Sequence, residues 1–393
     1  MRILMLHNFY QQPGGEDESF AAEADVMERN GHEVIRYTLH NDAIDLLHPV
    51  EIGLRTIWNP ASHGDISRLL ADSRPDVMHA QNVFPLISPA AYHAARRAGV
   101  PVVQSVRNYR MFCLNAQFFR DGRPCESCLG RTVPLAGLRN ACYRGSTLAS
   151  ASVATMLMTH RLLGTWSRCI DLFVTLSEFS RRKCIESGLP ADRVVTKPNF
   201  LKRDPGAGDG EGGYALFVGR LSPEKGIGTM LEAWRKPDMP MPLRVVGDGP
   251  EGTRVAGAGG QVEWLGRRDQ AQTLDLMRRA AVLVFPSEWY ETFGRVAVEA
   301  FAAGTPVVVA RIGAVAELVD HGRTGLLYEP GDAEDLAAQI RRLAADPKMA
   351  RAMRRAARQE YETKYTAERN YHLLSDIYRR AMARQPVPQP ATA

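Results

Sequence analysis

A chain of 393 residues is too long for one ordinary domain, so two domains of about 200 residues are expected. Its 45% apolar and 24% charged residues are typical of a soluble globular protein, and a net charge of +5 alone gives no reason to expect a nucleic-acid partner. The first residues become polar too early for a secretory signal, and no run of about 18 uncharged apolar residues predicts a membrane span. Six cysteines without such a signal indicate reduced thiols and a cytoplasmic protein.

Strand and helix patterns alternate through the first half of the chain. Buried strands are expected at residues 2–6, 34–39, 77–79, 100–106, 172–176 and 194–196. Helices are expected at residues 17–30, 65–73, 88–98, 146–168 and 178–187. Strands with helices between them indicate a parallel sheet joined by right-handed crossovers.

A polar, glycine-rich segment at residues 204–213 is typical of a linker, and the alternating pattern restarts after it. Further strands are expected at residues 214–218, 243–246, 262–265, 282–285 and 305–310. Further helices are expected at residues 226–235, 269–280, 296–303 and 332–346, followed by a charged helical stretch at 348–383. The predicted fold class is therefore α/β, with two doubly wound sheets.

The domain boundaries follow from this pattern. We expect an N-terminal domain at 1–203, the linker at 204–213, a C-terminal domain at 214–365, a final helix at 366–384 and a disordered tail at 385–393. The N-terminal domain includes an irregular, cysteine-containing loop at 112–143. Two such sheets joined by a hinge place a ligand in the cleft between them, at the carboxyl ends of the strands.

Positive charge is concentrated between residues 96 and 144. Nine arginines in this stretch face two acidic residues, Asp121 and Glu126, a local excess of +7. A solvated basic surface is one interpretation. The other is contact with an anionic acceptor or with phospholipid headgroups, which would place the protein peripherally on the inner face of the membrane.

Three strand–loop–helix junctions carry residues suited to phosphate and sugar. Residues 219–226 read G-R-L-S-P-E-K-G, in which Arg220 and Lys225 supply two cations for phosphate oxygens. Residues 291–299 read E-T-F-G-R-V-A-V-E, and a carboxylate on each side of such a turn can hold sugar hydroxyls. Gly14 and Gly15 follow the first strand, where backbone N–H groups can approach an anion.

Together these motifs resemble glycosyltransferase family 4, a retaining family with the GT-B architecture, in which two Rossmann-like domains face each other across a cleft. The resemblance covers nearly the whole chain. It implies that the N-terminal domain binds the acceptor, that the C-terminal domain binds the nucleotide sugar, and that the last helix crosses back onto the first domain. The implied donor-binding residues are Gly14, Gly15, Arg220, Lys225, Thr292, Phe293, Gly294 and Glu299.

The resemblance also implies individual roles. Glu299 would hold the ribose hydroxyls, Arg220 and Lys225 the diphosphate, and Glu291 the donor sugar as a catalytic residue. The sugar of a UDP-, GDP- or ADP-sugar would pass with retention to a hydroxyl of a saccharide or lipid-linked acceptor, in surface polysaccharide synthesis. No D-x-D motif stands out for a donor-bound metal, so we expect the two cations to serve in its place and no catalytic cofactor.

Two positions depart from the family's pattern. Arg107 stands where relatives often carry a histidine, and Gln81 replaces the second histidine of an H-x-H-N element that here reads His79-Ala80-Gln81-Asn82. We expect Arg107 at the reacting centre or on an anionic acceptor, and His79 and Asn82 on the acceptor side. Arginine cannot act as a base near neutral pH. A non-catalytic sugar-nucleotide binding protein, or a nucleotide-sugar epimerase on the same fold, therefore remains as an alternative.

Four cysteines in the irregular loop have the spacing C-x11-C-x2-C-x13-C. They are Cys113, Cys125, Cys128 and Cys142. Four thiols with one C-x2-C pair can hold a structural Zn²⁺, although a second such pair is lacking. A structural zinc, reduced thiols and a disulfide remain as alternatives.

Overall fold

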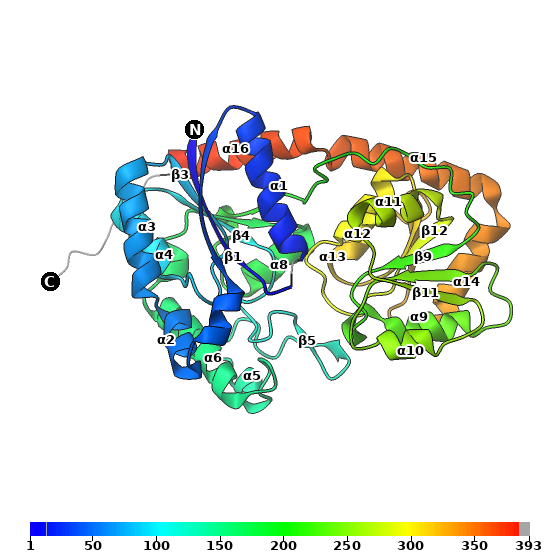
Figure 1. The fold of residues 1–393 in the computed structure, drawn as a ribbon, viewed down its shortest axis with the longest axis horizontal. Helices are drawn as coiled ribbons and strands as arrows, with labels where there is room; N and C mark the ends of the chain where they lie inside the picture. The colour runs from blue at the N-terminus through cyan, green and yellow to red at the C-terminus, as the bar shows by residue number, and fades with distance from the viewer. Residues whose placement is uncertain (13, 385–393) are drawn as a thin grey trace. The chain divides into compact units, whose positions relative to one another are not determined.

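The computed structural model describes residues 1–12 and 14–384, so the predicted tail at 385–393 lies outside the described residues. The chain divides into two compact units (Figure 1). Of the described residues, the first contains those at 1–118, 126–198 and 370–384, and the second contains those at 119–125 and 199–369. Over the described ranges, no helix combines the length and the apolar character needed to cross a bilayer.

The first unit is built on a six-stranded parallel sheet in the order β2-β1-β3-β4-β7-β8. Its strands are β1 (Arg2–Phe9), β2 (Glu33–His40), β3 (Val77–Asn82), β4 (Val102–Val106), β7 (Leu172–Thr175) and β8 (Val194–Thr196). The inner strands β3, β4 and β7 are buried along their whole length, which is typical of a parallel sheet covered on both faces.

Helices cover this sheet. They are α1 (Gly15–Arg29), α2 (Pro49–Ile57), α3 (Pro60–Ser73), α4 (Ala90–Arg97), α5 (Leu135–Arg139), α6 (Thr147–Leu162), α7 (Thr165–Arg168) and α8 (Glu178–Glu186), with short 3₁₀ turns η1 (Asn41–Leu46) and η2 (Ala191–Arg193). The prediction of one helix at 146–168 is wrong in detail, because Gly164 adopts φ +65° and separates α6 from α7. The sequence reading also missed α2.

The final helix α16 (Ala367–Ala383) packs on the first unit from Asn370 onward. Asn370 Nδ2 donates to Pro198 O at 3.2 Å, and Tyr378 is fully buried. The helix occupies the segment expected at 366–384.

The second unit has a six-stranded parallel sheet in the order β11-β10-β9-β12-β13-β14. Its strands are β9 (Ala215–Val218), β10 (Leu243–Val246), β11 (Val262–Gly266), β12 (Val282–Phe285), β13 (Val307–Ala310) and β14 (Gly325–Tyr328). Its helical elements are η3 (Pro223–Lys225), α9 (Ile227–Trp234), α10 (Gly252–Ala256), α11 (Gln270–Arg279), α12 (Arg295–Ala302), α13 (Gly313–Leu318), α14 (Ala333–Ala345) and α15 (Pro347–Lys364). The sequence pattern did not predict β14 or α13. A separate antiparallel pair joins β5 (Phe119–Arg120) to β6 (Arg123–Pro124).

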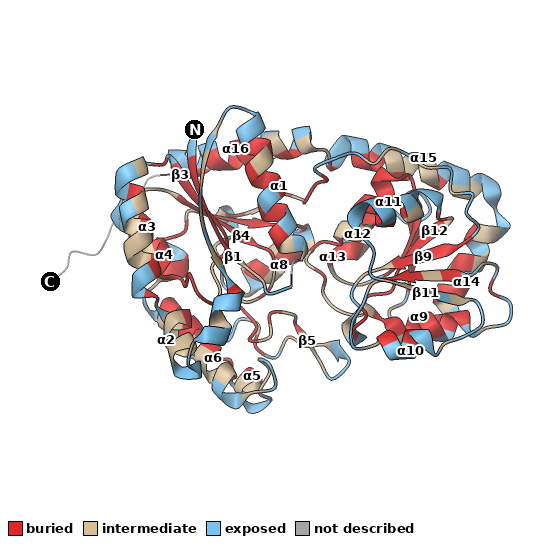
Figure 2. Cartoon of the chain, viewed as in Figure 1, coloured by how far each residue is buried: buried red, intermediate tan, exposed pale blue. Residues whose placement is uncertain are grey.

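The site is positioned by strands that all run in the same direction within each sheet. In each unit the sheet forms a buried layer, and the helices turn their buried faces toward it (Figure 2). Because all strands of a sheet are parallel, the loops that follow them emerge at the same edge. In the second unit the loops after β9, β10 and β12 therefore lie together.

Candidate active site

The loop after β9 is held against the loop after β12 by a glycine. Gly226 adopts φ +68°, and a Cβ at this position would lie 1.9 Å from Pro286 O. Only glycine allows both the backbone conformation and this close approach. The same contact brings η3, which ends in Lys225, against the segment that carries Glu291.

Glu291 is a buried carboxylate surrounded by donors. Its Oε1 accepts hydrogen bonds from Ser287 Oγ at 3.0 Å and from Trp289 Nε1 at 2.9 Å, and Lys225 Nζ forms an ion pair with the same oxygen. Lys225 Nζ also lies 5.3 Å from the centre of the Trp289 ring. A buried charge needs such partners, and they fix the two predicted site residues in one cluster.

Glu299 lies on α12, whose first turn follows the segment 292–294. Gly294 caps this helix with φ +108°, and Phe293 is buried with its ring 6.1 Å from that of Tyr365. Glu299 is 8% exposed, and its Oε1 lies 3.1 Å from Arg295 Nε. The start of α12 presents backbone N–H groups of the kind that hold phosphates, with the carboxylate one turn further along.

Arg220 completes the cation pair predicted for this edge of the sheet. It follows β9 by two residues and is exposed. Across residues 1–12 and 14–384, no carboxylate forms an ion pair with it. The edge therefore carries one compensated cation, Lys225, and one cation open to an anionic ligand.

Two features of this site were not anticipated from the sequence. Ser287 donates to Glu291, and Gly247 adopts φ +139° with a would-be Cβ 1.9 Å from Gly219 O, so that the loops after β9 and β10 pack closely. For Ser287 the available signal was the polar pair Ser287-Glu288, which follows β12 and Pro286. For Gly247 the signal was its position in a G-D-G-P turn directly after a strand.

The turn of the first unit that carries Gly14 and Gly15 has free space beside both glycines. Gly14 caps α1 and Gly15 begins it, and a Cβ at either position would touch nothing within 4 Å. Gly14 N donates to Asp17 Oδ2 at 2.9 Å, so a carboxylate already satisfies one N–H of this turn. The donor-binding role of Gly14 and Gly15 stays a prediction.

His79 does not lie on an acceptor surface, which corrects the sequence prediction. It is fully buried, with Nδ1 2.7 Å from the Tyr378 hydroxyl and Nε2 2.9 Å from Ser105 Oγ. Burial lowers the pKa of His79 to about 4, so the ring is neutral near pH 7. Its partner Tyr378 comes from α16, at the far end of the chain.

Arg107 also points into the protein interior. Its Nη2 donates to Glu23 at 2.9 Å and its Nε donates to Gln81, while Lys197 Nζ lies 2.7 Å from Glu23. Burial alone would raise the pKa of Glu23, but Lys197 and Arg107 outweigh it and hold that pKa well below its usual value. These contacts give Arg107 and Gln81 a structural role, and the catalytic role of Arg107 stays a prediction.

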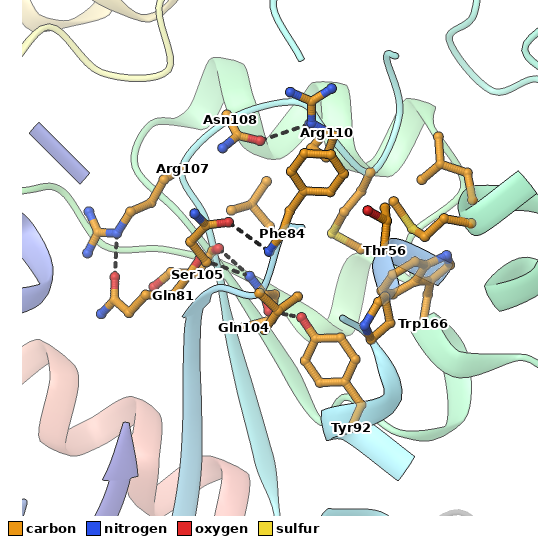
Figure 3. A pocket seen from close by; sticks show the side chains of 17 residues that line it. Thr56, Gln81, Phe84, Tyr92, Gln104, Ser105, Arg107, Asn108, Arg110 and Trp166 are labelled. Atoms are coloured by element: carbon orange, nitrogen blue, oxygen red, sulfur yellow. Dashed lines mark hydrogen bonds between the residues drawn. The ribbon is translucent and has the colours of Figure 1, made fainter. Parts of the chain in front are cut away.

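Asn82 lines a pocket of about 60 Å³ in the first unit (Figure 3). Its Nδ2 donates to Asn8 O at 2.7 Å and its Oδ1 accepts from Phe84 N at 3.0 Å, so the side chain shapes the wall. Arg110, a lining residue that the sequence reading did not select, places its guanidinium 4.5 Å from the Phe84 ring and 4.7 Å from the Tyr143 ring. The pocket is smaller than a typical ligand site.

The cysteine loop does not gather a metal site. None of the six cysteines is joined in a disulfide within the described chain. Nor do three or more His, Cys, Asp or Glu side chains of those residues come together around a point that could hold a metal ion. The zinc proposed for Cys113, Cys125, Cys128 and Cys142 stays a prediction.

Comparison with protein families identifies both halves of the chain. The family "Glycosyl transferases group 1" matches residues 201–360, and the family "Glycosyl transferase 4-like domain" matches residues 14–199. Glycogen synthase of Mycobacterium tuberculosis is 35% identical over 222 residues, which cover 52% of this chain and 50% of the relative. D-inositol 3-phosphate glycosyltransferase of Saccharomonospora viridis is 34% identical over 214 residues, which cover 50% of this chain and 45% of the relative. The chain thus spans about half the length of the curated relatives it matches.

Solved structures share the fold over nearly the whole chain. The Anabaena protein Alr3699/HepE, crystallised in complex with UDP, superposes with a TM-score of 0.68 at 19% identity and covers 96% of this chain and 99% of its own. Sucrose-phosphate synthase of Thermosynechococcus elongatus gives a TM-score of 0.72 at 19% identity, covering 97% and 99%. The predicted α/β class with two Rossmann-like units is confirmed, and the chain belongs to the group 1 glycosyltransferases of the GT-B fold.

Proposed function

We propose that this protein transfers a sugar from a nucleoside diphosphate sugar to a hydroxyl of an acceptor. The observation that carries the proposal is the cluster at the strand ends of the second unit, where Lys225, Glu291 and the start of α12 meet beside the open cation Arg220. Cations and helix N–H groups suit a diphosphate, and a carboxylate suits sugar hydroxyls. The relatives named above are transferases or synthases, and HepE was crystallised with UDP and with UDP-glucose, which supports a nucleotide sugar as donor.

The site residues divide the work of such a reaction. Arg220 and Lys225 would neutralise the charge that develops on the leaving diphosphate. Glu291, held by Ser287 and Trp289, would face the sugar, and Glu299 would hold the ribose. With two fixed cations at the phosphates, we propose a retaining, metal-independent transfer in surface polysaccharide synthesis.

A nucleotide screen followed by a matched variant tests this proposal. Binding of UDP-, GDP- or ADP-glucose should raise the melting temperature, because a ligand of the folded state stabilises it by mass action. Glu299→Ala should weaken binding of the best nucleotide roughly 10- to 150-fold, because a hydrogen bond to a charged group contributes about 1.5–3 kcal/mol.

The control for Glu299 is Glu362→Ala. Glu362 pairs with Arg358 four residues away in α15, as Glu299 pairs with Arg295 in α12, but it lies outside the site. Equal nucleotide affinity for the two variants in titration calorimetry would refute the ribose assignment. Absence of binding by any nucleotide sugar would refute the proposed function.

A second candidate is a binding protein without turnover. The observation that favours it is that Arg107 and Gln81, at positions where relatives often carry histidines, are both engaged with Glu23. Measurable nucleotide-sugar binding without hydrolysis or transfer over prolonged incubation would select this candidate. Release of nucleoside diphosphate with an acceptor-dependent rate would exclude it.

A further inference from the structure

Large apolar side chains are exposed on neighbouring helices of the first unit. Eleven large hydrophobic side chains are exposed among the described residues, and nine of them fall between residues 46 and 163. These nine are Leu46, Val50, Leu54, Trp58, Val133, Leu135, Leu148, Leu162 and Leu163. Single exposed apolar residues are normal, whereas a gathering on adjacent elements marks a contact surface.

The helix α2 shows how the apolar side chains are presented. Val50 and Leu54 are 57% and 63% exposed and lie four residues apart, so they share one side of the helix. A different side packs on α6, where a Cβ on Gly53 would lie 2.9 Å from Ser152 Oγ. Val50 and Leu54 are therefore not needed to hold α2 on the unit.

A hollow of about 250 Å³ opens between α2 and the start of α6. Its mainly apolar lining includes Pro49, Ile52, Gly53, Leu148, Ala149 and Val153. Leu148, at the beginning of α6, is 66% exposed. In Figure 1 the helices α2, α5 and α6 lie at the same end of the first unit, and both α2 and α5 contact α6.

The charges next to this apolar surface are mainly positive. Residues 127–170, which include α5 and α6, contain no Asp or Glu and five arginines: Arg131, Arg139, Arg144, Arg161 and Arg168. Residues 41–58 contribute three carboxylates and one arginine, and Glu51 and Arg55 of these form an ion pair. Six arginines against three carboxylates leave the two segments together with a net charge of +3.

We propose that the α2–α6 surface, formed by η1, α2, α5 and the first half of α6, docks on an anionic lipid bilayer. Exposed Leu and Val side chains would enter the headgroup boundary, and the arginines of α5 and the following loop would meet acidic headgroups. Exposed apolar side chains beside a net positive charge are typical of a membrane-interface surface. Access to a lipid-linked acceptor would follow, and that extension alone rests on the proposed function.

Vesicle flotation of the full-length protein tests the docking surface. Binding should be stronger to vesicles of phosphatidylcholine with phosphatidylglycerol than to phosphatidylcholine alone, and high salt should weaken it. Val50→Gln with Leu54→Gln should lower vesicle affinity at least about tenfold through the lost apolar burial. Arg139→Gln with Arg144→Gln should lower it roughly 25-fold, about fivefold for each arginine near the headgroups.

Matched controls lie outside this surface. Met382→Gln in α16 removes an apolar side chain that is 37% exposed, and Arg351→Gln with Arg355→Gln in the second unit removes two exposed arginines. The controls should bind vesicles as the wild type does, and all variants should keep the wild-type melting temperature and nucleotide affinity.

Several outcomes would overturn the proposal. They are absence of vesicle binding, equal binding by α2–α6 and control variants, and equal binding to neutral vesicles at every salt concentration. A dimer in light scattering that only the Val50 and Leu54 variants dissociate would assign the surface to a second copy instead. If neither the wild type nor any variant binds a nucleotide, the proposed function is refuted, but the vesicle experiment still tests the docking surface.

Discussion

Arg107 illustrates how a residue selected for chemistry can serve the fold. Its side chain is 2% exposed and lies in one network with Glu23, Lys197 and Gln81. Two cations and one carboxylate in the interior are tolerated only because each is hydrogen bonded. Removing Glu23 would leave two buried cations uncompensated, whereas removing Arg107 takes one hydrogen bond each from Glu23 and Gln81.

We therefore predict that Arg107→Met destabilises the first unit. Because Glu23 keeps Lys197 as its remaining cation, the expected cost is that of the lost charge-assisted hydrogen bonds, about 1.5–3 kcal/mol. Arg36→Met, which removes the exposed pair with Glu28, should cost less than about 1 kcal/mol. Urea unfolding followed by circular dichroism measures both. A variant at Arg107 that unfolds like the wild type but loses transfer activity would instead support the catalytic role.

A second residue-scale prediction concerns Lys225. Lys225→Met should weaken binding of a nucleoside diphosphate roughly 10- to 150-fold, because a charge-assisted hydrogen bond of about 1.5–3 kcal/mol is lost, and should leave binding of the free nucleoside nearly unchanged. Lys236→Met is the control, since Lys236 also pairs with a carboxylate, Glu334, in the second unit. Titration calorimetry with both ligands decides the matter. An equal loss for nucleoside and diphosphate would show that Lys225 does not act on the phosphates.

At the scale of elements, the contact between two loops depends on Gly226. Gly226→Ala should destabilise the second unit and weaken nucleotide binding, because the added Cβ meets Pro286 O and displaces the Lys225 loop. Gly259→Ala is a matched control, with φ +62° against +68° and nothing within 4 Å of the added Cβ. It should cost only the left-handed backbone penalty of about 1–2 kcal/mol. Thermal melting with and without nucleotide separates the two effects, and equal behaviour of the variants would contradict the steric argument.

The elements that the sequence predicted well are those with a local signal. Short, mainly apolar runs located eleven of the twelve strands of the two main sheets, and the segments 219–226 and 291–299 follow the predicted strands β9 and β12. β14 is four residues long and gave too little signal. The helix α2 was missed because Gly53 interrupts its pattern and because its packing on α6 involves residues about 100 positions away.

The burial of polar side chains in the first unit could not be predicted from the local sequence. His79 is the third residue of the six-residue strand β3, and from sequence a histidine there suits a ligand site as well as a core. What decides its role is Tyr378, 299 residues further along the chain. Similarly, Arg107 meets Glu23 across 84 residues, and no spacing rule connects them. The site of the second unit was easier because its residues follow neighbouring strands directly.

At the scale of the whole molecule, histidines are distributed unequally. Nine of the ten histidines belong to the first unit, and His321 alone belongs to the second. Burial lowers the pKa of five of the nine from the ordinary value of 6.5: His32, His63, His79, His93 and His160. His79 and His93 fall to about 4, and near His93 the charges of His160, His63 and Arg97 add to the effect of burial.

This distribution predicts that mild acid destabilises the first unit selectively. Because the folded-state pKa values lie below 6.5, the unfolded chain binds protons first, so stability is full above pH 6.5 and falls as the pH drops toward about 4. His79 alone should account for roughly 3 kcal/mol of that loss. Glu23 has a lowered pKa and adds its own loss only below its ordinary value of 4.5, so it does not contribute to the loss of stability above pH 4.5.

Scanning calorimetry across this interval, without ligand, should show one transition moving to lower temperature as the pH falls and another staying nearly constant. His79→Gln can still hydrogen bond Ser105 and Tyr378 but cannot be protonated, so it should flatten the pH dependence of the moving transition. His321→Gln, in the second unit, should leave that dependence unchanged. If both transitions shift together, or if His79→Gln keeps the full pH dependence, the buried histidines are not what makes the first unit sensitive to acid.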